Sequence, residues 1–453
     1  RNSETRNQRR TRPSTFCFDS MNHLNKEKLH IHNWQPYRAC GLLSKVSGNL
    51  IEVDGLSACL GELCKISSTK DPNLLAEVIG FHNHTTLLMS LSPLHSVALG
   101  TEVLPLRRPP SLHLSDHLLG RVLDAFGNPI DKKEDLPKTH RKPLLSLPPS
   151  PMMRQPIDQI FPTGIKAIDA FLTLGKGQRI GVFSEPGSGK SSLLSAIALG
   201  SKSTINVIAL IGERGREVRE YIEKHSNALK QQRTIIIAAP AHETAPTKVI
   251  AGRAAMTIAE YFREQGHEVL FIMDSLSRWI AALQEVALAR GETLSAHQYA
   301  ASVFHHVSEF TERAGNNDKG SITALYAILY YPKHPDIFTD YLKSLLDGHF
   351  FLTSQGKALA SPPIDILSSL SRSAQALALP HHYAAAERLR SLLKVYNEAL
   401  DIIHLGAYTP GQDEELDKAV KLLPSIKAFL AQPLSSYCYL DNTLKQLEAL
   451  ADS

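Results

Sequence analysis

Between residues 161 and 370 the chain alternates short apolar runs with longer segments in which apolar positions recur at helical spacing. The apolar runs are almost unbroken, which is typical of strands buried on both faces of a parallel sheet. They lie at 179–184, 205–211, 234–239, 269–273 and 321–329. Strands joined by helices predict an α/β fold with a mostly parallel sheet, in which ligands bind at the carboxyl ends of the strands.

A different pattern precedes this region. Between 40 and 106 the apolar runs are short, at 48–53, 63–66 and 76–81, and turn pairs such as Asp54-Gly55 separate them. Many short strands at close spacing predict a small β-barrel. Residues 107–160 are rich in proline. They predict an extended linker that leads from the barrel into the sheet region.

The two ends of the chain differ. Residues 380–453 predict a helical domain, because apolar residues recur at helical spacing, most clearly between Tyr383 and His404.

The N-terminal residues are basic and polar, without the apolar stretch of a secretory signal. The first methionine is Met21. We expect the native start there, with residues 1–20 an artefact of gene-start choice, or else a disordered basic tail.

Composition narrows the class of protein. A length of 453 residues predicts about three domains, and the net charge of +4 is too small to require a nucleic-acid partner. The five cysteines are scattered without a Cys-x-x-Cys pair. They predict reduced thiols in a cytosolic protein, with neither a disulfide framework nor a zinc site. There is no run of about 18 apolar residues, so no membrane-spanning helix is expected.

The first strand of the sheet region runs into a glycine-rich loop. The phosphate-binding P-loop follows the template G-x-x-x-x-G-K-[ST], and here only its first glycine is replaced, by a serine. A strand before and a helix after the loop disfavour a chance match. Successive backbone N–H groups would cradle phosphates, Lys190 would reach the β- and γ-phosphates, and Ser191 would offer its hydroxyl to Mg²⁺. The candidate nucleotide-binding residues are Ser184, Glu185, Pro186, Gly187, Ser188, Gly189, Lys190, Ser191 and Ser192.

Polar residues follow two other strands of the predicted sheet. Asp274 closes the run at 269–273 and would hold Mg²⁺ through its water shell. Glu213 follows the run at 205–211, where a carboxylate can polarise the water that attacks the γ-phosphate, and Arg214 can stabilise the charge. A salt-bridged surface loop is the alternative for Glu213 and Arg214.

These segments, with others in the same order, resemble the flagellar and type III secretion export ATPases, relatives of the F1 ATP synthase α and β subunits. The resemblance covers roughly residues 36–432. It includes Asp-Ser-Leu-Ser-Arg-Trp at 274–279 and a signature at 363–371 that is shared by the whole F1-like group. Further matching segments lie at 119–131, 161–169, 287–292, 302–304, 312–316 and 346–349.

The resemblance implies a RecA-like P-loop core that hydrolyses ATP with Mg²⁺. It implies a β-barrel domain at 36–106, an ATPase domain at 107–375 with its proline-rich lead-in, and a helical domain at 376–453, after a basic segment at 1–35. Glu213 matches the family's catalytic glutamate, and Arg372 matches the arginine finger offered to the neighbouring subunit. For Arg372 a structural salt bridge is the alternative.

The resemblance also implies partners. We expect a homohexamer with a stator and a central stalk protein, acting on export substrates and their chaperones and binding no nucleic acid. The N-terminal segment would contact the stator. The protein would be cytoplasmic and peripheral at the inner membrane, where it would dock on the export gate. Neither the choice between a flagellum and an injectisome nor the exported substrates follow from the sequence.

The chain departs from the family at several positions. Ser361 stands where the family has an aromatic residue that would stack on adenine. Glu185 and Pro186 replace the first half of the usual glycine-rich loop, and Ala300-Ala301 replaces a pair of prolines. The stretch 330–334 is shorter than the family's acidic loop. We therefore expect an active but divergent member.

Three other functions are alternatives to an export ATPase. A rotary ATP synthase subunit would assemble with a different partner subunit and a proton channel. A Rho-type RNA translocase would need stacking aromatics on the barrel, where only Phe81 occurs among Phe, Tyr and Trp. A non-hydrolysing scaffold would bind nucleotide only, and Glu213 and Arg372 speak against it.

Overall fold

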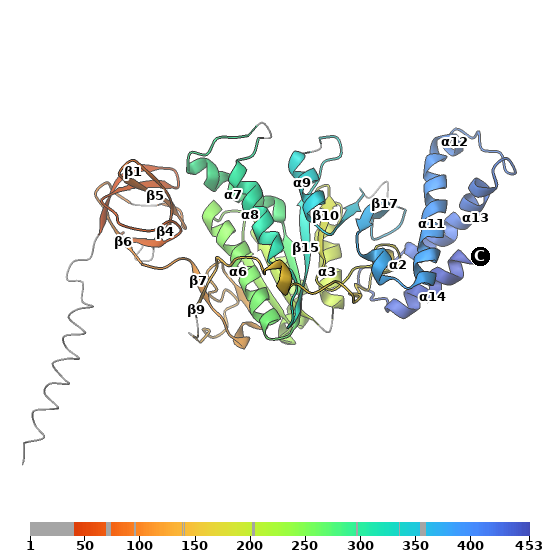
Figure 1. Ribbon diagram of the computed structural model, residues 1–453, viewed down its shortest axis with the longest axis horizontal. Coiled ribbons are helices and arrows are strands. Elements are labelled where there is room, and N and C mark those ends of the chain that lie inside the picture. The colour runs from red at the N-terminus through yellow and green to blue at the C-terminus, as the bar shows by residue number, and fades with distance from the viewer. Residues whose placement is uncertain are drawn as a thin grey trace, which may run out of the picture.

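The computed structural model describes residues 40–453 except 69–73, 95–96, 138, 140, 202–203, 296–297, 335 and 354–358. The basic segment predicted at 1–35 therefore lies outside the described residues. Three parts follow one another along the longest axis of the molecule: a barrel, a sheet flanked by helices, and a group of helices at the C-terminal end (Figure 1).

The predicted β-barrel is confirmed. Six strands close in the order β1-β2-β5-β4-β3-β6. Alternate strand residues such as Ile51, Val53 and Val78 are fully buried in its core, as the two-residue period of a half-buried strand requires. The strands are β1 (Gly41–Ser47), β2 (Leu50–Asp54), β3 (Leu63–Ile66), β4 (Leu75–His82), β5 (Thr85–Ser90) and β6 (Glu102–Pro105).

The central sheet carries the strands that the apolar runs predict. Its order is β17-β16-β10-β15-β13-β11-β12-β8, and β14 pairs with β15. All neighbours on this path are parallel except β16 and β17, which are antiparallel. The strands are β8 (Val122–Leu123), β10 (Arg179–Ser184), β11 (Ile205–Ile211), β12 (Thr234–Ala239), β13 (Glu268–Asp274), β14 (Gly315–Asn316), β15 (Ser321–Leu329), β16 (Gly348–Leu352) and β17 (Ile364–Ser371).

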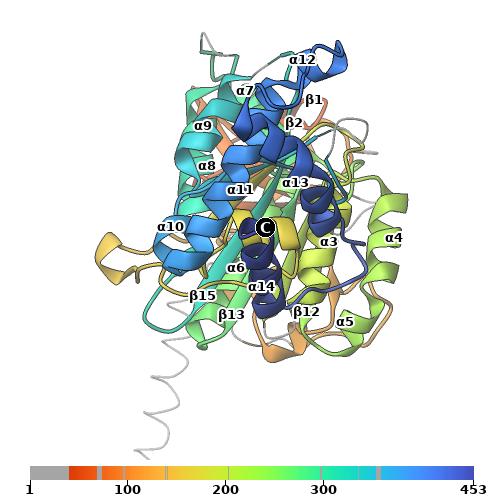
Figure 2. The same cartoon turned by 90° about the vertical axis from the view of Figure 1, so that its right-hand side faces the viewer.

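Helices cover both faces of this sheet, so alternate strand residues enter two separate cores. Val207 and Ala209 pack with α6 (Ala245–Glu264), α7 (Leu276–Ala289) and α8 (Ala301–Glu312). Ile208 and Leu210 pack on the other face with the helices that precede and follow the P-loop and with the C-terminal helices. Figure 2 shows α3 and α4 on the side opposite α8 and α9. The remaining helices of this part are α2 (Lys166–Phe171), α3 (Lys190–Gly200), α4 (Gly215–Lys224), α5 (Ser226–Lys230) and α9 (Ile337–Leu345).

The proline-rich segment is more than the extended linker that was expected. It forms a two-stranded sheet from β7 (Ser111–His113) and β9 (Arg141–Pro143), and it adds β8 to the edge of the central sheet. Val122 and Leu123 pair with Ile236 and Ile237 of β12, and they are buried. Two short helical turns, η1 (Asp116–Leu118) and η2 (Pro151–Met153), complete the segment.

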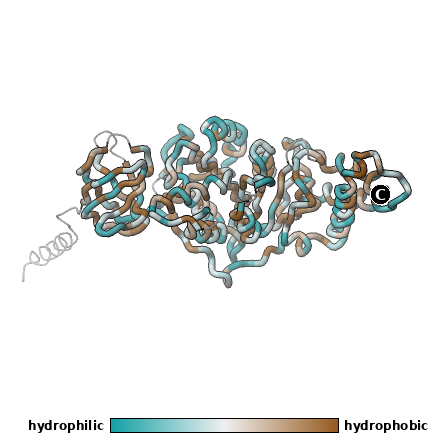
Figure 3. Tube along the Cα trace, turned by 90° about the horizontal axis from the view of Figure 1, so that it is seen from above, coloured by the Kyte–Doolittle hydropathy of each residue, from teal (hydrophilic) through white to brown (hydrophobic). Residues whose placement is uncertain are grey.

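The C-terminal part is helical, as expected. Its long helices α11, α13 and α14 pack on one another and on α2 of the central part. No helix among the described residues is long and apolar enough to span a membrane, and Figure 3 shows apolar and polar positions interleaved along the chain. The helices are α10 (Ala374–Leu377), α11 (Pro380–Glu398), α12 (Leu400–His404), α13 (Glu414–Leu430) and α14 (Leu440–Ala451).

Candidate active site

Three polar loops meet at one edge of the sheet. The glycine-rich loop follows β10, Glu213 follows β11, and Asp274 ends β13. These strands lie in the order β10-β15-β13-β11 and run parallel. Their carboxyl ends therefore share an edge, which is where ligands bind in sheets of this kind.

The glycine-rich loop has its conformation because two of its glycines are left-handed. Gly187 has φ +80° and Gly189 has φ +90°, values that cost other residues about 1–2 kcal/mol. A Cβ at either position would meet nothing within 4 Å, so backbone conformation and not space requires glycine there. Ser184 needs no such freedom, because it is the last residue of β10 and pairs in register with Leu329 and Leu352.

Lys190 and Ser191 open α3 and point to the end of β13. The hydroxyl of Ser191 donates to Oδ2 of Asp274 at 2.7 Å, and Nζ of Lys190 lies 3.3 Å from Oδ1 of Asp274. The Asp274 side chain is only 3% exposed. A hydroxyl beside a carboxylate is the hard oxygen donor set that Mg²⁺ prefers, and the buried Ser188 hydroxyl has no partner among the described residues. The residues present therefore fit a bound phosphate and its metal.

Glu213 lies beside this group with a perturbed carboxyl. Burial raises the pKa of Glu213 to about 7, and a hydrogen bond with Glu217 and the charge of Asp274 act in the same direction. Arg278 of α7 opposes the shift, with its Nη1 3.4 Å from Oε2 of Glu213. A carboxyl that titrates near neutral pH suits a general base.

The structure brings Arg278, and not Arg214, next to Glu213. Arg214 points to solvent with 82% of its side chain exposed, and its only ion pair among the described residues is with Glu217 at 3.6 Å. Arg278 lies over Gly212, where a Cβ would come within 2.8 Å of its Cδ, and it donates to the Gly212 carbonyl. The resemblance at 274–279 includes Arg278, but the sequence does not indicate that it faces Glu213.

A cavity of about 240 Å³ opens between α3 and α4 beside these residues. Tyr221 forms one wall of this cavity, which the sequence did not predict. Its hydroxyl is buried and has no partner among the described residues. The Tyr221 ring stacks on His225, with centroids 4.1 Å apart. The cavity is lined by Ser191, Ser192, Ser195, Leu210, Glu213, Glu217, Val218, Glu220, Tyr221, Lys224 and Asp274.

Arg372 is not part of this cluster. It follows β17 directly, and β17 runs antiparallel to β16, so that Ile364 pairs with Leu352 at the P-loop edge and Ser371 pairs with Gly348 at the opposite edge. The eight residues of β17 separate the two edges by about 25 Å. The Arg372 side chain therefore cannot reach the P-loop of its own subunit.

Three family models match consecutive parts of the chain. They are the β-barrel domain of the ATP synthase alpha/beta family at 43–107, the nucleotide-binding domain of that family at 164–371, and the T3SS EscN ATPase C-terminal domain at 378–449. The type 3 secretion system ATPase of Xanthomonas euvesicatoria is 38% identical over 419 residues, which cover 92% of this chain and 95% of that protein. The flagellum-specific ATP synthase of Bacillus subtilis is 37% identical over 423 residues, 91% and 95% of the two chains.

A solved structure supports the same assignment. The assembled ATPase EscN from the type III secretion system of enteropathogenic E. coli superposes with a TM-score of 0.86 at 35% identity, over 91% of this chain and 100% of EscN. The fold and the glycine-rich loop thus define a P-loop ATPase with a RecA-like core. The chain belongs to the type III secretion and flagellum-specific ATPases within the ATP synthase alpha/beta family.

Proposed function

We propose that this ATPase drives protein export through a flagellar or type III secretion apparatus. Hydrolysis would release substrates from their chaperones and unfold them. The observation that carries the proposal is the convergence of Lys190, Ser191, Asp274 and Glu213 at one edge of the sheet. The similarity to secretion and flagellum-specific ATPases over more than 90% of the chain supports the role in export.

In the proposed reaction a water attacks the γ-phosphate in line with the leaving oxygen. Glu213 orients this water and accepts its proton, for which its raised pKa is suited. Lys190 moves from Asp274 to the phosphate oxygens and stabilises their charge. Arg278 takes the charge-stabilising role that the sequence assigned to Arg214, because Arg278 lies beside Glu213. Ser191 and Asp274 would hold Mg²⁺, which when bound neutralises charge on the phosphate oxygens.

We propose that Arg372 acts on the nucleotide of a neighbouring subunit in a homohexamer. The separation of Arg372 from its own P-loop supports this, and so does the similarity to assembled EscN. Arginine fingers of this kind accelerate GTPases by about 10³–10⁵.

The further partners are part of the proposal. EscN has been solved in complex with its central stalk EscO, and this chain matches that structure with a TM-score of 0.82. We propose a central stalk protein, a stator, and docking on the export gate at the cytoplasmic face of the inner membrane.

Phosphate release by the protein and by Glu213→Gln tests the hydrolytic role. We expect the substitution to lower the rate at least about 100-fold, the scale of a lost general base. Glu220→Gln is the matched control, because Glu220 lies on α4 and lines the same cavity, while its one ion pair among the described residues is with exposed Arg216. Equal and negligible rates for the parent and Glu213→Gln would favour a nucleotide-binding scaffold. Stimulation by RNA, or isolation in a ring with a second kind of subunit, would favour the translocase or the rotary synthase.

A further inference from the structure

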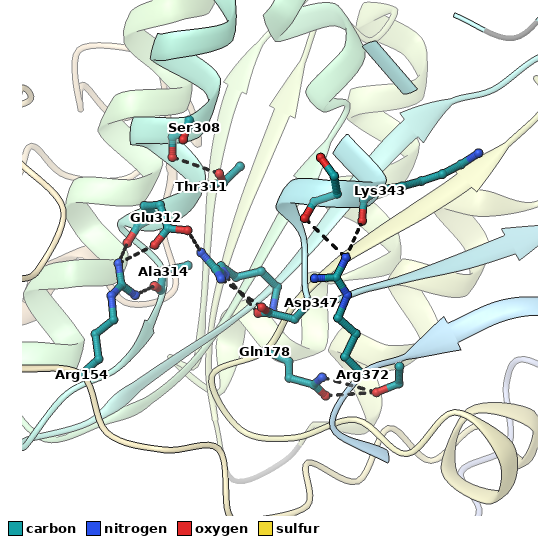
Figure 4. A network of polar contacts seen from close by, with 12 residues as sticks. Arg154, Gln178, Ser308, Thr311, Glu312, Ala314, Lys343, Asp347 and Arg372 are labelled. Carbon is teal, nitrogen blue, oxygen red and sulfur yellow. Dashed lines mark hydrogen bonds and ion pairs between the residues drawn. The ribbon is translucent and has the colours of Figure 1, made fainter. Parts of the chain in front are cut away.

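Three backbone carbonyls hold Arg372, and all three belong to residues 343–347. Figure 4 shows the two that the Arg372 guanidinium contacts. The backbone N–H of Arg372 donates to the carbonyl of Asp347 at 3.0 Å. Its Nη2 donates to the carbonyls of Lys343 at 3.1 Å and Ser344 at 3.4 Å. These two carbonyls belong to the last turn of α9, where unpaired carbonyls and the helix dipole favour a cation. The direction in which Arg372 leaves the sheet is therefore set by the turn between α9 and β16.

The ion pair between Asp347 and Arg179 fixes this turn to β10, the strand that runs into the P-loop. Asp347 Oδ2 accepts from the backbone N–H and the Nε of Arg179, both at 2.9 Å, and Oδ1 accepts from Nη2 at 2.9 Å. The backbone N–H of Asp347 in turn donates to the Arg179 carbonyl at 2.8 Å. Arg179 is the first residue of β10, whose last residue begins the P-loop. A bidentate arginine–carboxylate pair restricts geometry as well as adding energy.

The pair is embedded in a longer chain of charges. Arg179 Nη1 also contacts Glu312 at the end of α8, and Arg154 reaches the same carboxylate at 2.7 Å. Burial alone would lower the pKa of Arg179, but the hydrogen bonds and charges of Asp347 and Glu312 raise it above its ordinary value. Arg179 is 15% exposed and Asp347 is 22% exposed, so solvent screens the pair only in part.

We propose that Asp347, held by Arg179, is a positioning residue for Arg372 and determines where its guanidinium meets the nucleotide of the neighbouring subunit. This inference rests on the proposed function, in which Arg372 acts in trans. Asp347 touches no nucleotide itself, and the site in its own subunit lies at the other edge of the sheet. A displacement of about 1 Å in a group that stabilises a transition state can lower the rate about 100-fold.

The first test is steady-state ATP hydrolysis by Asp347→Asn, a substitution that keeps the volume of the side chain. We expect kcat to fall about 10- to 100-fold while KM changes by less than about threefold, because the P-loop side of each nucleotide pocket is untouched. The matched control is Asp131→Asn. Asp131 forms the same kind of pair with Arg121, at 2.8 Å and 3.1 Å, in the same part of the molecule but without contact to Arg372. A comparable loss of kcat in the control would assign the effect to general stability.

A mixing experiment separates the two roles of a subunit, which are to bind ATP at its own P-loop and to donate Arg372 to its neighbour. Lys190→Ala removes the P-loop lysine and keeps the finger, whereas Arg372→Ala keeps the P-loop and removes the finger. Assemblies that contain both variants, co-expressed with different tags and purified through both, should regain ATPase activity at interfaces where the intact halves meet. Asp347→Asn is then added to one partner at a time.

The expected result is asymmetric. Asp347→Asn combined with Lys190→Ala should no longer complement Arg372→Ala, since the finger it donates is misplaced. Asp347→Asn combined with Arg372→Ala should still be complemented by Lys190→Ala. Equal loss in both combinations would overturn the positioning role and leave the trans finger standing. Failure of the two parent variants to complement each other would overturn the trans finger, and this inference with it.

Discussion

Nζ of Lys190 lies 3.3 Å from Oδ1 of Asp274, so the first residue of α3 is paired with the last residue of β13. Both side chains are largely buried, 11% and 3% exposed. In the proposed reaction, Lys190 would exchange this carboxylate for phosphate oxygens, and Asp274 would become available to Mg²⁺. The pair therefore keeps both charges compensated before nucleotide binds.

Asp274→Asn should uncouple nucleotide binding from Mg²⁺. The amide keeps the shape of the side chain but loses the charge that Mg²⁺ requires in its shell. We expect ATP affinities measured with Mg²⁺ and with a chelator to agree within about twofold in the variant, and phosphate release to fall at least about 100-fold. Titration of a fluorescent ATP analogue under both conditions measures the first effect. An undiminished preference for Mg²⁺ would show that other residues hold the metal.

Hydrolysis should lose rate as the pH falls through neutrality. In the proposed mechanism the carboxylate form of Glu213 is the base, and the pKa of Glu213 is raised to about 7. Below this value the carboxyl is protonated, so kcat/KM should fall about tenfold per pH unit and level off above it. The residual rate of Glu213→Gln should lack this inflection, and Glu220→Gln should retain it. A parent profile that is flat from pH 5.5 to 8 would contradict the assignment of Glu213 as the base.

Replacing Ser184 by glycine should hardly change the activity of the glycine-rich loop. An added side chain at one of its left-handed glycines should lower that activity. Gly189→Ala places a Cβ at φ +90° and should lower kcat/KM at least about tenfold, since about 1.4 kcal/mol of strain corresponds to a factor of ten. Ser184→Gly restores the strict motif at the end of a regular strand. It should leave kcat/KM within about threefold, because Ser184 does not need the freedom of glycine. A large gain in Ser184→Gly would show that the serine hydroxyl hinders phosphate binding.

The apolar pattern locates β10, β11, β12, β13 and β15 of the central sheet almost to the residue, but it does not indicate β8, β14, β16 or β17. The runs at 179–184, 205–211 and 234–239 are β10, β11 and β12, because strands buried on both faces consist of apolar residues bounded by polar ones. The sequence does not indicate strand β8, because only Val122 and Leu123 pair with β12 and they lie within a proline-rich segment. No local pattern marks so short an edge strand.

The candidate site was predictable only where it lies in the loops that follow these strands. Lys190, Ser191, Glu213 and Asp274 follow predicted strands, and the parallel order brings them together. The placement of Arg278 depends on its packing over Gly212, a contact between α7 and the end of β11. The role of Asp347 depends on the reversed direction of β17, which returns Arg372 to the edge where β10 begins. Neither relationship has a local sequence pattern.

Ser361→Tyr should tighten nucleotide binding if the adenine lies near the end of the sheet at Ser361. Ser361 is exposed and lies three residues before β17, whose first residue pairs with Leu352 at the P-loop edge. Its carbonyl accepts a hydrogen bond from the backbone N–H of Gln432 at 2.7 Å, so the backbone here is fixed against the connection between α13 and α14. A side chain added at Ser361 therefore starts from a defined point near the edge of the sheet that carries the P-loop.

An aromatic ring at this point would stack on the base and contribute about 0.5–1.5 kcal/mol, or roughly a 2- to 12-fold gain in affinity. Calorimetric titration with a non-hydrolysable ATP analogue measures the gain, and Ser361→Leu separates stacking from added apolar area. The gain should be larger for tyrosine than for leucine, since only the ring has a π-face. Equal affinities for the parent and Ser361→Tyr would mean that other residues hold the adenine and that the absence of an aromatic side chain here does not limit binding.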